Sequence, residues 1–220
     1  MHPARRDFLA LTLTLALGAC NTTAFNRDRH GPSDVEDYIA GLESPERRAE
    51  LQPELVVERL ALAPDAWVAD LGCGPGVFSR AFARACSAGV VFAVDIEPLQ
   101  LDRLREHLRA ERLENVVPVL ASADTPHLPP GRFDLVFIGD TYHHFEDRVA
   151  YMRALRKVLE PGGRLALLEY KPGNLPVGPP AERKLSPGEL EDELRAAGWR
   201  LDARFDTHRW HDFQVWSPLP

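Results

Sequence analysis

The feature that most constrains this sequence is an alternation of short apolar runs with longer amphipathic segments. The short runs have strand length and are apolar on both faces, which is typical of parallel strands buried between two layers of helices. We expect strands at 67–72, 90–96, 116–121, 133–140 and 163–170, and helices at 77–86, 98–113 and 148–159. This order predicts an α/β protein whose parallel sheet is covered on both sides.

The chain departs from this pattern after the fifth predicted strand. Ser186 and Glu189 form a predicted capping box at the start of a helix that ends at Gly198. Two strands follow, at 199–205 and 209–216, and the link between them is too short for a crossover. The sequence therefore predicts an antiparallel hairpin in this part of the chain.

A glycine-rich loop follows the first predicted strand. The sequence VADLGCGPG places glycines at 72, 74 and 76, where they allow sharp turns and close approach of the backbone to a ligand. A dinucleotide site would need G-x-G-x-x-G, and Gly76 stands one place too early for it. A Walker loop would need a Gly-Lys-Ser/Thr ending, which this loop lacks. Asp70, expected at the mouth of the loop, would repel a pyrophosphate and attract a cation.

Acidic residues stand at the ends of four successive predicted strands. They are Asp70, Asp95, Asp124 and Asp140. In an open parallel sheet, ligands bind beyond the carboxyl ends of the strands, where these four side chains would meet. A carboxylate in the position of Asp95 can accept hydrogen bonds from both ribose hydroxyls of a nucleoside.

Five stretches of the chain, in order, resemble motifs of the class I S-adenosylmethionine-dependent methyltransferases that act on small molecules. They are VADLGCGPG, VDIEP, ASADTPHLP, FDLVFIGDTYHHFED and LRKVLEPGGRLALLEY. The similarity extends over about residues 50–216. It implies a doubly wound, Rossmann-like sheet of seven strands in the order 3-2-1-4-5-7-6, with strand 7 antiparallel.

The resemblance also implies which residues bind S-adenosylmethionine. The methionine part of the cofactor is expected beside Asp70, Gly72, Gly74 and Gly76, with Asp140 near the same end. The nucleoside part is expected to have its ribose at Asp95, its adenine against Ile96 and its adenine edge at Ala123 and Asp124.

The acceptor of the methyl group is expected over the end of the fourth strand, which carries GDTYHHFED. His143 is our candidate general base, because imidazole titrates near neutral pH, and Tyr142 would shape the pocket. His144 is adjacent and should point in a different direction. Alternatively, one of these histidines caps the next helix and the other packs in the interior. Together with Glu146 they have suitable ligand types for a metal but not the regular spacing of structural zinc sites, so no metal is predicted.

The sequence indicates no definite functional role for the other histidines of the domain or for one long loop. We expect surface positions for His107, His127, His208 and His211. The proline- and glycine-rich loop 171–184 either forms a stiff flap over the acceptor or only connects two elements.

The first 20 residues have the pattern of a bacterial signal peptide. Arg5 and Arg6 precede an apolar run from Phe8 to Gly18, which is too short to span a bilayer. The two arginines resemble a twin-arginine export signal, and LGAC resembles a lipobox in which Cys20 is lipidated. Cys20 would then anchor the mature protein to a membrane.

The chain is therefore divided into a signal peptide with a lipobox (1–20), a flexible tether (21–34) and a methyltransferase domain (35–220). The domain would begin with helices over 35–62, where Ser44 is a predicted N-cap and Pro45 the first helical residue. A domain of this size can form a full hydrophobic core.

The sequence thus predicts an exported, lipid-anchored methyltransferase that acts on a small molecule or envelope component on the periplasmic side of a membrane. Without processing of the signal, it would stay at the cytoplasmic face. The alternative is an exported protein that binds S-adenosylmethionine or a nucleoside with little or no turnover. The net charge of -7, without a basic cluster, argues against nucleic acid as a partner. The oligomeric state is left open.

Overall fold

The computed structural model describes residues 35–220, in which seven strands form one sheet in the order β3-β2-β1-β4-β5-β7-β6. The strands are β1 (Trp67–Leu71), β2 (Val90–Asp95), β3 (Val116–Leu120), β4 (Phe133–Gly139), β5 (Leu159–Tyr170), β6 (Trp199–Phe205) and β7 (His211–Pro218). The first five are parallel, and β7 is antiparallel to both β5 and β6. The predicted strand order and the predicted terminal hairpin are confirmed.

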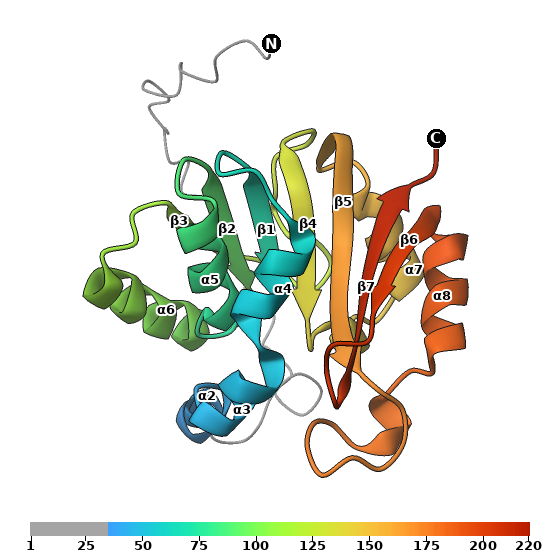
Figure 1. The fold of residues 1–220 in the computed structure, drawn as a ribbon, viewed down its shortest axis with the longest axis horizontal. Helices are drawn as coiled ribbons and strands as arrows, with labels where there is room; N and C mark the ends of the chain where they lie inside the picture. The colour runs from blue at the N-terminus through green and yellow to red at the C-terminus, as the bar shows by residue number, and fades with distance from the viewer. Residues whose placement is uncertain (1–34) are drawn as a thin grey trace, which may run out of the picture. The chain divides into compact units, whose positions relative to one another are not determined.

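Helices cover both faces of this sheet (Figure 1). One face packs against α4 (Pro53–Leu60), α5 (Val77–Ala85) and α6 (Pro98–Glu111), and the other against α7 (Arg148–Leu155) and α8 (Pro187–Ala196). Two short helices, α2 (Val35–Leu42) and α3 (Pro45–Leu51), lie beyond the edge of the sheet at which β4 ends (Figure 1). Two single 3-10 turns, η1 (Tyr142–His144) and η2 (Ala181–Arg183), complete the described elements.

Local sequence signals account for several helix starts. The Ser44 side chain accepts a hydrogen bond from the backbone N–H of Arg47 at 3.2 Å, and Pro45 is the first residue of α3. The predicted capping box of α8 is present, with Ser186 and Glu189 each bonding the other's backbone N–H. Both predictions are confirmed.

The third predicted helix ends earlier than expected. It was predicted over 148–159, but α7 stops at Leu155, and Leu159 is the first residue of β5. The backbone N–H groups of Gly131, Arg132 and Phe133 donate to the carbonyls of 157 and 158. These carbonyls bond to the start of β4 instead of continuing the helix. Within residues 35–220, no helix is long and apolar enough to cross a membrane.

Candidate functional site

The carboxyl ends of β1, β2, β4 and β5 lie along one edge of the sheet, where the site was predicted. Because β7 is antiparallel, its first residue reaches the same edge, and Tyr170 at the end of β5 is paired with His211. The topology therefore places a histidine from the last strand beside Asp140, which precedes it by 71 positions in the chain.

The glycine loop is shaped by contacts within the protein as well as by its turns. Gly72, Gly74 and Gly76 have φ values of 68°, 53° and 87°, in the left-handed region that favours glycine. A Cβ atom on Gly72 would lie 2.2 Å from Oγ1 of Thr141, and one on Gly76 would lie 2.3 Å from a methyl group of Leu104. Gly72 and Gly76 are thus required for packing, whereas a Cβ on Gly74 would meet only ordinary contacts.

Asp95 joins the end of β2 to this loop. One oxygen of its carboxylate accepts the backbone N–H of Gly74 at 2.8 Å, and the other accepts the N–H of Glu97 at 2.9 Å. Burial raises the pKa of Asp95, and these backbone donors partly offset the rise. The acid predicted to bind ribose therefore lies directly beside the central glycine.

Asp70 lies beneath the loop, so the prediction that it stands at the loop mouth is wrong. It is 1% exposed, and the hydroxyl of Ser79 in α5 donates to its carboxylate. Burial raises the pKa of Asp70 to about 7. The reason for its position is strand geometry: Asp70 is inside β1, one residue before its end, and every residue of β1 after Trp67 is buried.

The predicted adenine contacts lie farther along the edge. Ile96 is half-buried just after β2, while Ala123 and Asp124 are exposed. Asp124 follows the end of β3 by four residues, and its carboxylate accepts the Ser122 hydroxyl at 2.7 Å. That hydrogen bond lowers the pKa of Asp124.

Asp140, after β4, is the centre of a cluster of charged and aromatic side chains. Arg47 of α3 donates to the Asp140 carboxylate at 2.7 Å and to the Tyr170 hydroxyl at 2.7 Å. His211 Nε2 lies 3.0 Å from the second Asp140 oxygen, and its ring centre is 4.3 Å from that of Tyr170. Burial alone would raise the pKa of Asp140, but His211 and Arg47 hold it below its usual value.

His143 lies next to this cluster and contacts a buried acid. Its Nδ1 atom is 3.0 Å from Oε1 of Glu169, and its backbone N–H donates to the other Glu169 oxygen at 3.4 Å. Only 4% of the His143 side chain and 5% of that of Glu169 are exposed. The rings of His143 and His144 are 4.2 Å apart, so they lie side by side rather than in the divergent arrangement expected for a loop.

Tyr142 is a core residue, contrary to the prediction that it shapes a pocket. It is fully buried against the helices on the α7 and α8 face, and its hydroxyl donates to Glu193 of α8 at 2.7 Å. Burial raises its pKa. The 3-10 turn η1 directs Tyr142 into the interior, and Asp147 caps α7 in place of either histidine.

Two histidines predicted at the surface are buried. His208 is 2% exposed and lies 3.0 Å from the carbonyl oxygen of Leu51, and His211 is 1% exposed. The hairpin turn folds them under α3 and the end of β5, which the sequence pattern of a single strand does not reveal. His107 is half-buried and paired with Glu43, and His127 is exposed.

Three further residues of this edge were not predicted: Arg47, Glu169 and Gln100. Glu169 could have been found from the sequence, because it is a charged residue at the end of the apolar run 165–168 of β5. Gln100 likewise stands among leucines on the buried side of α6. No sequence pattern indicated a role for Arg47, because its partner Asp140 is 93 residues away in the sequence.

Loop 171–184 folds back on Tyr170. A Cβ atom on Gly178 would lie 2.5 Å from the Tyr170 ring, and the Lys184 ammonium lies 5.8 Å from the ring centre. Lys184 also donates to the carbonyl of Gly173 at 3.1 Å, which closes the loop on itself. The loop therefore borders the Asp140 cluster.

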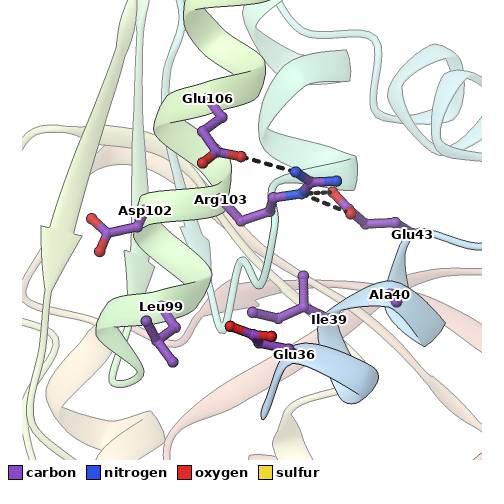
Figure 2. Close-up of a pocket in the computed structure, with 8 residues that line it drawn as sticks. All are labelled: Glu36, Ile39, Ala40, Glu43, Leu99, Asp102, Arg103 and Glu106. Atoms are coloured by element: carbon purple, nitrogen blue, oxygen red, sulfur yellow. Dashed lines mark hydrogen bonds and ion pairs between the residues drawn. The ribbon is translucent and has the colours of Figure 1, made fainter.

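A pocket of about 320 Å³ between α2 and α6 adjoins the other side of the edge (Figure 2). Four acids, one arginine and three apolar residues line it: Glu36, Glu43, Asp102, Glu106, Arg103, Ile39, Ala40 and Leu99. Arg103 bonds Glu43 at 2.9 Å and Glu106 at 2.9 Å (Figure 2). The ion pair between Arg103 and Glu43 connects the segment that follows α2 to α6, beside the glycine loop.

Comparisons with known proteins agree with this architecture. A family model described as a methyltransferase domain matches residues 68–163. The ubiquinone biosynthesis O-methyltransferase of Xanthomonas euvesicatoria pv. vesicatoria is 32% identical over 166 residues, which cover 68% of each chain. Aklanonic acid methyltransferase DauC of Streptomyces sp. (strain C5) is 30% identical over 139 residues. That match covers 62% of this chain and 63%, less than two thirds, of DauC.

A solved structure extends the likeness of fold to most of the domain. The crystal structure of a SAM dependent methyltransferase from Aquifex aeolicus has a TM-score of 0.78 to this chain, with 24% sequence identity. The superposition covers 82% of this chain and 96% of that one. The likeness includes the seven-stranded sheet.

Proposed function

The chain belongs to the class I S-adenosylmethionine-dependent methyltransferases, and on that basis we propose that it transfers a methyl group to a small-molecule or envelope acceptor. The observation that carries the proposal is the hydrogen bond between the Gly74 N–H and the Asp95 carboxylate. It joins the loop that would hold the methionine part of the cofactor to the acid that would hold its ribose.

The residues present at this edge fit the cofactor. A Cβ atom built on Gly74 would meet Leu42 and Gln100 only at ordinary contact distances, and as a glycine this residue presents its backbone without a side chain. The oxygen of Gln100 is buried without a hydrogen-bond partner among residues 35–220. A buried acceptor beside a glycine cradle and a carboxylate suits a ligand that carries hydroxyl and ammonium donors.

S-adenosylmethionine, when bound, supplies an electrophilic methyl group on a sulfonium. The protein positions the two reactants in line and removes a proton if the acceptor is a hydroxyl, thiol or amine. We assign proton removal to His143. In this assignment the Nδ1–H of the His143 ring donates a hydrogen bond to Glu169, which leaves Nε2 as the proton acceptor.

We further propose that the protein is exported and anchored through Cys20. The twin arginines Arg5 and Arg6 and the lipobox support this, and they lie outside the described residues. A twin-arginine route carries folded proteins, so the cofactor, which is made in the cytoplasm, could cross with the domain. An unprocessed signal would instead keep the domain at the cytoplasmic face.

Export also supports the second candidate function, a binding protein with little or no turnover. The two functions share the cofactor site and differ only in the acceptor step. The experiment that separates them purifies the exported form, searches it by mass spectrometry for S-adenosylhomocysteine and measures binding by calorimetry. Failure to bind either adenosyl ligand contradicts both functions, and binding without methylation of any offered acceptor supports the second.

The anchor has its own test. Cells that express the full chain are fed labelled palmitate, and the label should follow the wild-type protein but not the Cys20→Ala variant. Equal labelling of the two proteins contradicts the assignment of Cys20.

A further inference from the structure

Asp70 is a buried acid of β1 that lies between two apolar neighbours. It is 1% exposed, and its partners in the adjacent strands are Ala93 of β2 and Phe137 of β4, both fully buried. Its carboxylate accepts the hydroxyl of Ser79 in α5. A carboxyl group in such surroundings, with a neutral hydroxyl as its partner, is more stable with its proton bound than without it.

The charge that acts on Asp70 within the described residues is that of a second acid, Asp95. Burial is the main cause that raises the pKa of Asp70 to about 7; the Ser79 hydroxyl opposes this rise, and the charge of Asp95 adds to it. The glycine loop begins just after Asp70, and its Gly74 N–H donates to Asp95 at 2.8 Å. The loop therefore runs between two carboxyl groups, which favours a cation at this position.

The reactant and the product of the proposed reaction differ in charge at this loop. S-adenosylmethionine carries a sulfonium, so its net charge is one unit more positive than that of S-adenosylhomocysteine, whose sulfur is a neutral thioether. A cation beside a buried acid favours the ionised form of the acid, whereas a neutral sulfur does not. Asp70 therefore responds to the charge by which the two ligands differ.

We propose that Asp70 distinguishes S-adenosylmethionine from S-adenosylhomocysteine, because it releases its proton to solvent when the sulfonium binds and keeps it when the thioether binds. The inference rests on the proposed function, since it assumes an adenosyl ligand at the glycine loop. It makes Asp70 a specificity determinant, whose ionised carboxylate stabilises the bound reactant but not the bound product. The preference for the reactant should therefore increase with pH over the interval in which Asp70 titrates.

The experiment is calorimetry of the purified full chain with each of the two ligands, at intervals from pH 5.5 to pH 7.5 and without a methyl acceptor. The measured quantity is the ratio of the two dissociation constants. For the wild-type protein, the preference for S-adenosylmethionine should be about 3- to 10-fold larger at pH 7.5 than at pH 5.5, as expected if the sulfonium stabilises the ionised carboxylate by about tenfold.

Proton release is a second readout of the same titrations. Two buffers that differ in their enthalpy of ionisation give the number of protons released, and at pH 6.5 S-adenosylmethionine should release about half a proton more than S-adenosylhomocysteine. Sinefungin, which bears an ammonium group in place of the methylsulfonium, should behave like S-adenosylmethionine. Proton release with S-adenosylmethionine but not with sinefungin would attribute the effect to the methyl group and contradict the inference.

Three variants assign the effect to Asp70. Asp70→Asn keeps the size of the side chain but cannot ionise, so its preference should not change with pH. Asp134→Asn is the matched control, because Asp134 is a half-buried acid at the opposite edge, where it accepts the Trp67 N–H at 2.6 Å; it should keep the wild-type pH dependence. Ser79→Ala removes the donor that opposes the rise in pKa, so the change in preference should move to higher pH. It provides the decisive comparison if Asp70→Asn does not fold.

Other titratable groups near the loop do not account for a difference between the wild type and Asp70→Asn. Burial raises the pKa of the Cys73 thiol well above its usual value, so the thiol stays neutral in this interval. Asp95 is present in both proteins, as are His143 and His211 at the same edge. Their contributions are therefore common to both.

The outcomes separate the inference from the function on which it rests. If the wild-type protein binds both ligands with a ratio that is constant over the pH range, Asp70 does not distinguish them and the proposed function stands. The same conclusion follows if Asp70→Asn keeps the wild-type pH dependence, if Asp134→Asn loses it, or if Ser79→Ala leaves its midpoint unchanged. If the wild-type protein binds neither ligand, the proposed function fails, and the inference fails with it.

Discussion

Nδ1 of His143 lies 3.0 Å from Oε1 of Glu169, and the two side chains are almost completely buried. The same Glu169 oxygen accepts the backbone N–H of Tyr170 at 2.9 Å, so the carboxylate itself is held in place. A carboxylate fixed in this way selects the tautomer of the imidazole and stabilises the imidazolium once a proton is taken up.

Replacing His143 by Ala should lower the rate of methyl transfer by about 10²–10⁴-fold, the usual contribution of a general base, while leaving the affinity for S-adenosylhomocysteine unchanged. Glu169→Gln keeps the size of the partner but removes its charge, and should lower the rate as well. Steady-state kinetics measures the rate of methyl transfer, and calorimetry measures the affinity for S-adenosylhomocysteine. His144→Ala is the control, and an equal loss of rate in that variant would contradict the assignment to His143.

Replacing Asp95 by Ala should weaken cofactor binding by about 1–3 kcal/mol, because hydrogen bonds to a charged group are lost. The variant also loses the tie to Gly74, so part of the effect comes from a less ordered loop. Calorimetry with S-adenosylhomocysteine measures it. Unchanged affinity would show that the ribose does not lie at Asp95.

The stability of the domain should fall as the pH rises from about 4 to 7, because of Asp70. Burial raises its pKa from 3.8 to about 7, so the folded protein binds more protons than the unfolded chain in that interval. The free energy of unfolding then decreases with pH, by at most about 4 kcal/mol. Urea unfolding at pH 5 and pH 8 should show a smaller pH dependence for Asp70→Asn than for the wild type. Parallel profiles for the two proteins would exclude this role.

Replacing Arg47 by Ala should lower the free energy of unfolding by about 1–3 kcal/mol, since it leaves the buried Asp140 with one charged neighbour fewer. Arg105→Ala is the matched control: its bond to Asp102 is exposed and should contribute less than about 1 kcal/mol. Urea unfolding of both variants compares them. Equal losses of unfolding free energy in the two variants would show that the Arg47–Asp140 pair contributes no more to stability than an exposed ion pair.

Gly72→Ala should be more destabilising than Gly131→Ala. Both glycines have positive φ, 68° and 64°, so both substitutions cost about 1–2 kcal/mol in backbone strain. A Cβ on Gly131 meets nothing within 4 Å, whereas one on Gly72 overlaps Thr141. The overlap should add about 1–3 kcal/mol. Thermal or urea unfolding gives the difference, and equal values would contradict the overlap.

The fold was predictable because its signals are local and repeated. Apolar runs with strand length, caps such as Ser44 and the short hairpin link each follow from neighbouring residues. The end of α7 was not predictable in the same way, because it depends on hydrogen bonds from the start of β4. The carbonyls of Lys157 and Val158 bond to a segment that is distant in the sequence, and the helical spacing of apolar residues does not predict such bonds.

The site was predictable only for residues that stand at strand ends. Asp95 lies where the pattern placed it, beside the glycine loop. Arg47 and His211 meet Asp140 through the packing of α3 and the direction of β7, which depend on the tertiary structure. Tyr142 was misplaced because a single 3-10 turn decides whether its ring points to the edge or into the core.

The position of β7 between β5 and β6 has a consequence for the order in which the edge is completed. During synthesis, β5 and β6 leave the ribosome first, and β7 must then insert between them. Asp140 can therefore pair with Arg47 while the chain is still growing, but it meets His211 only after the final hairpin has closed. A nascent chain would thus have its glycine loop and its Arg47–Asp140 pair in place before the contact between Asp140 and His211 forms.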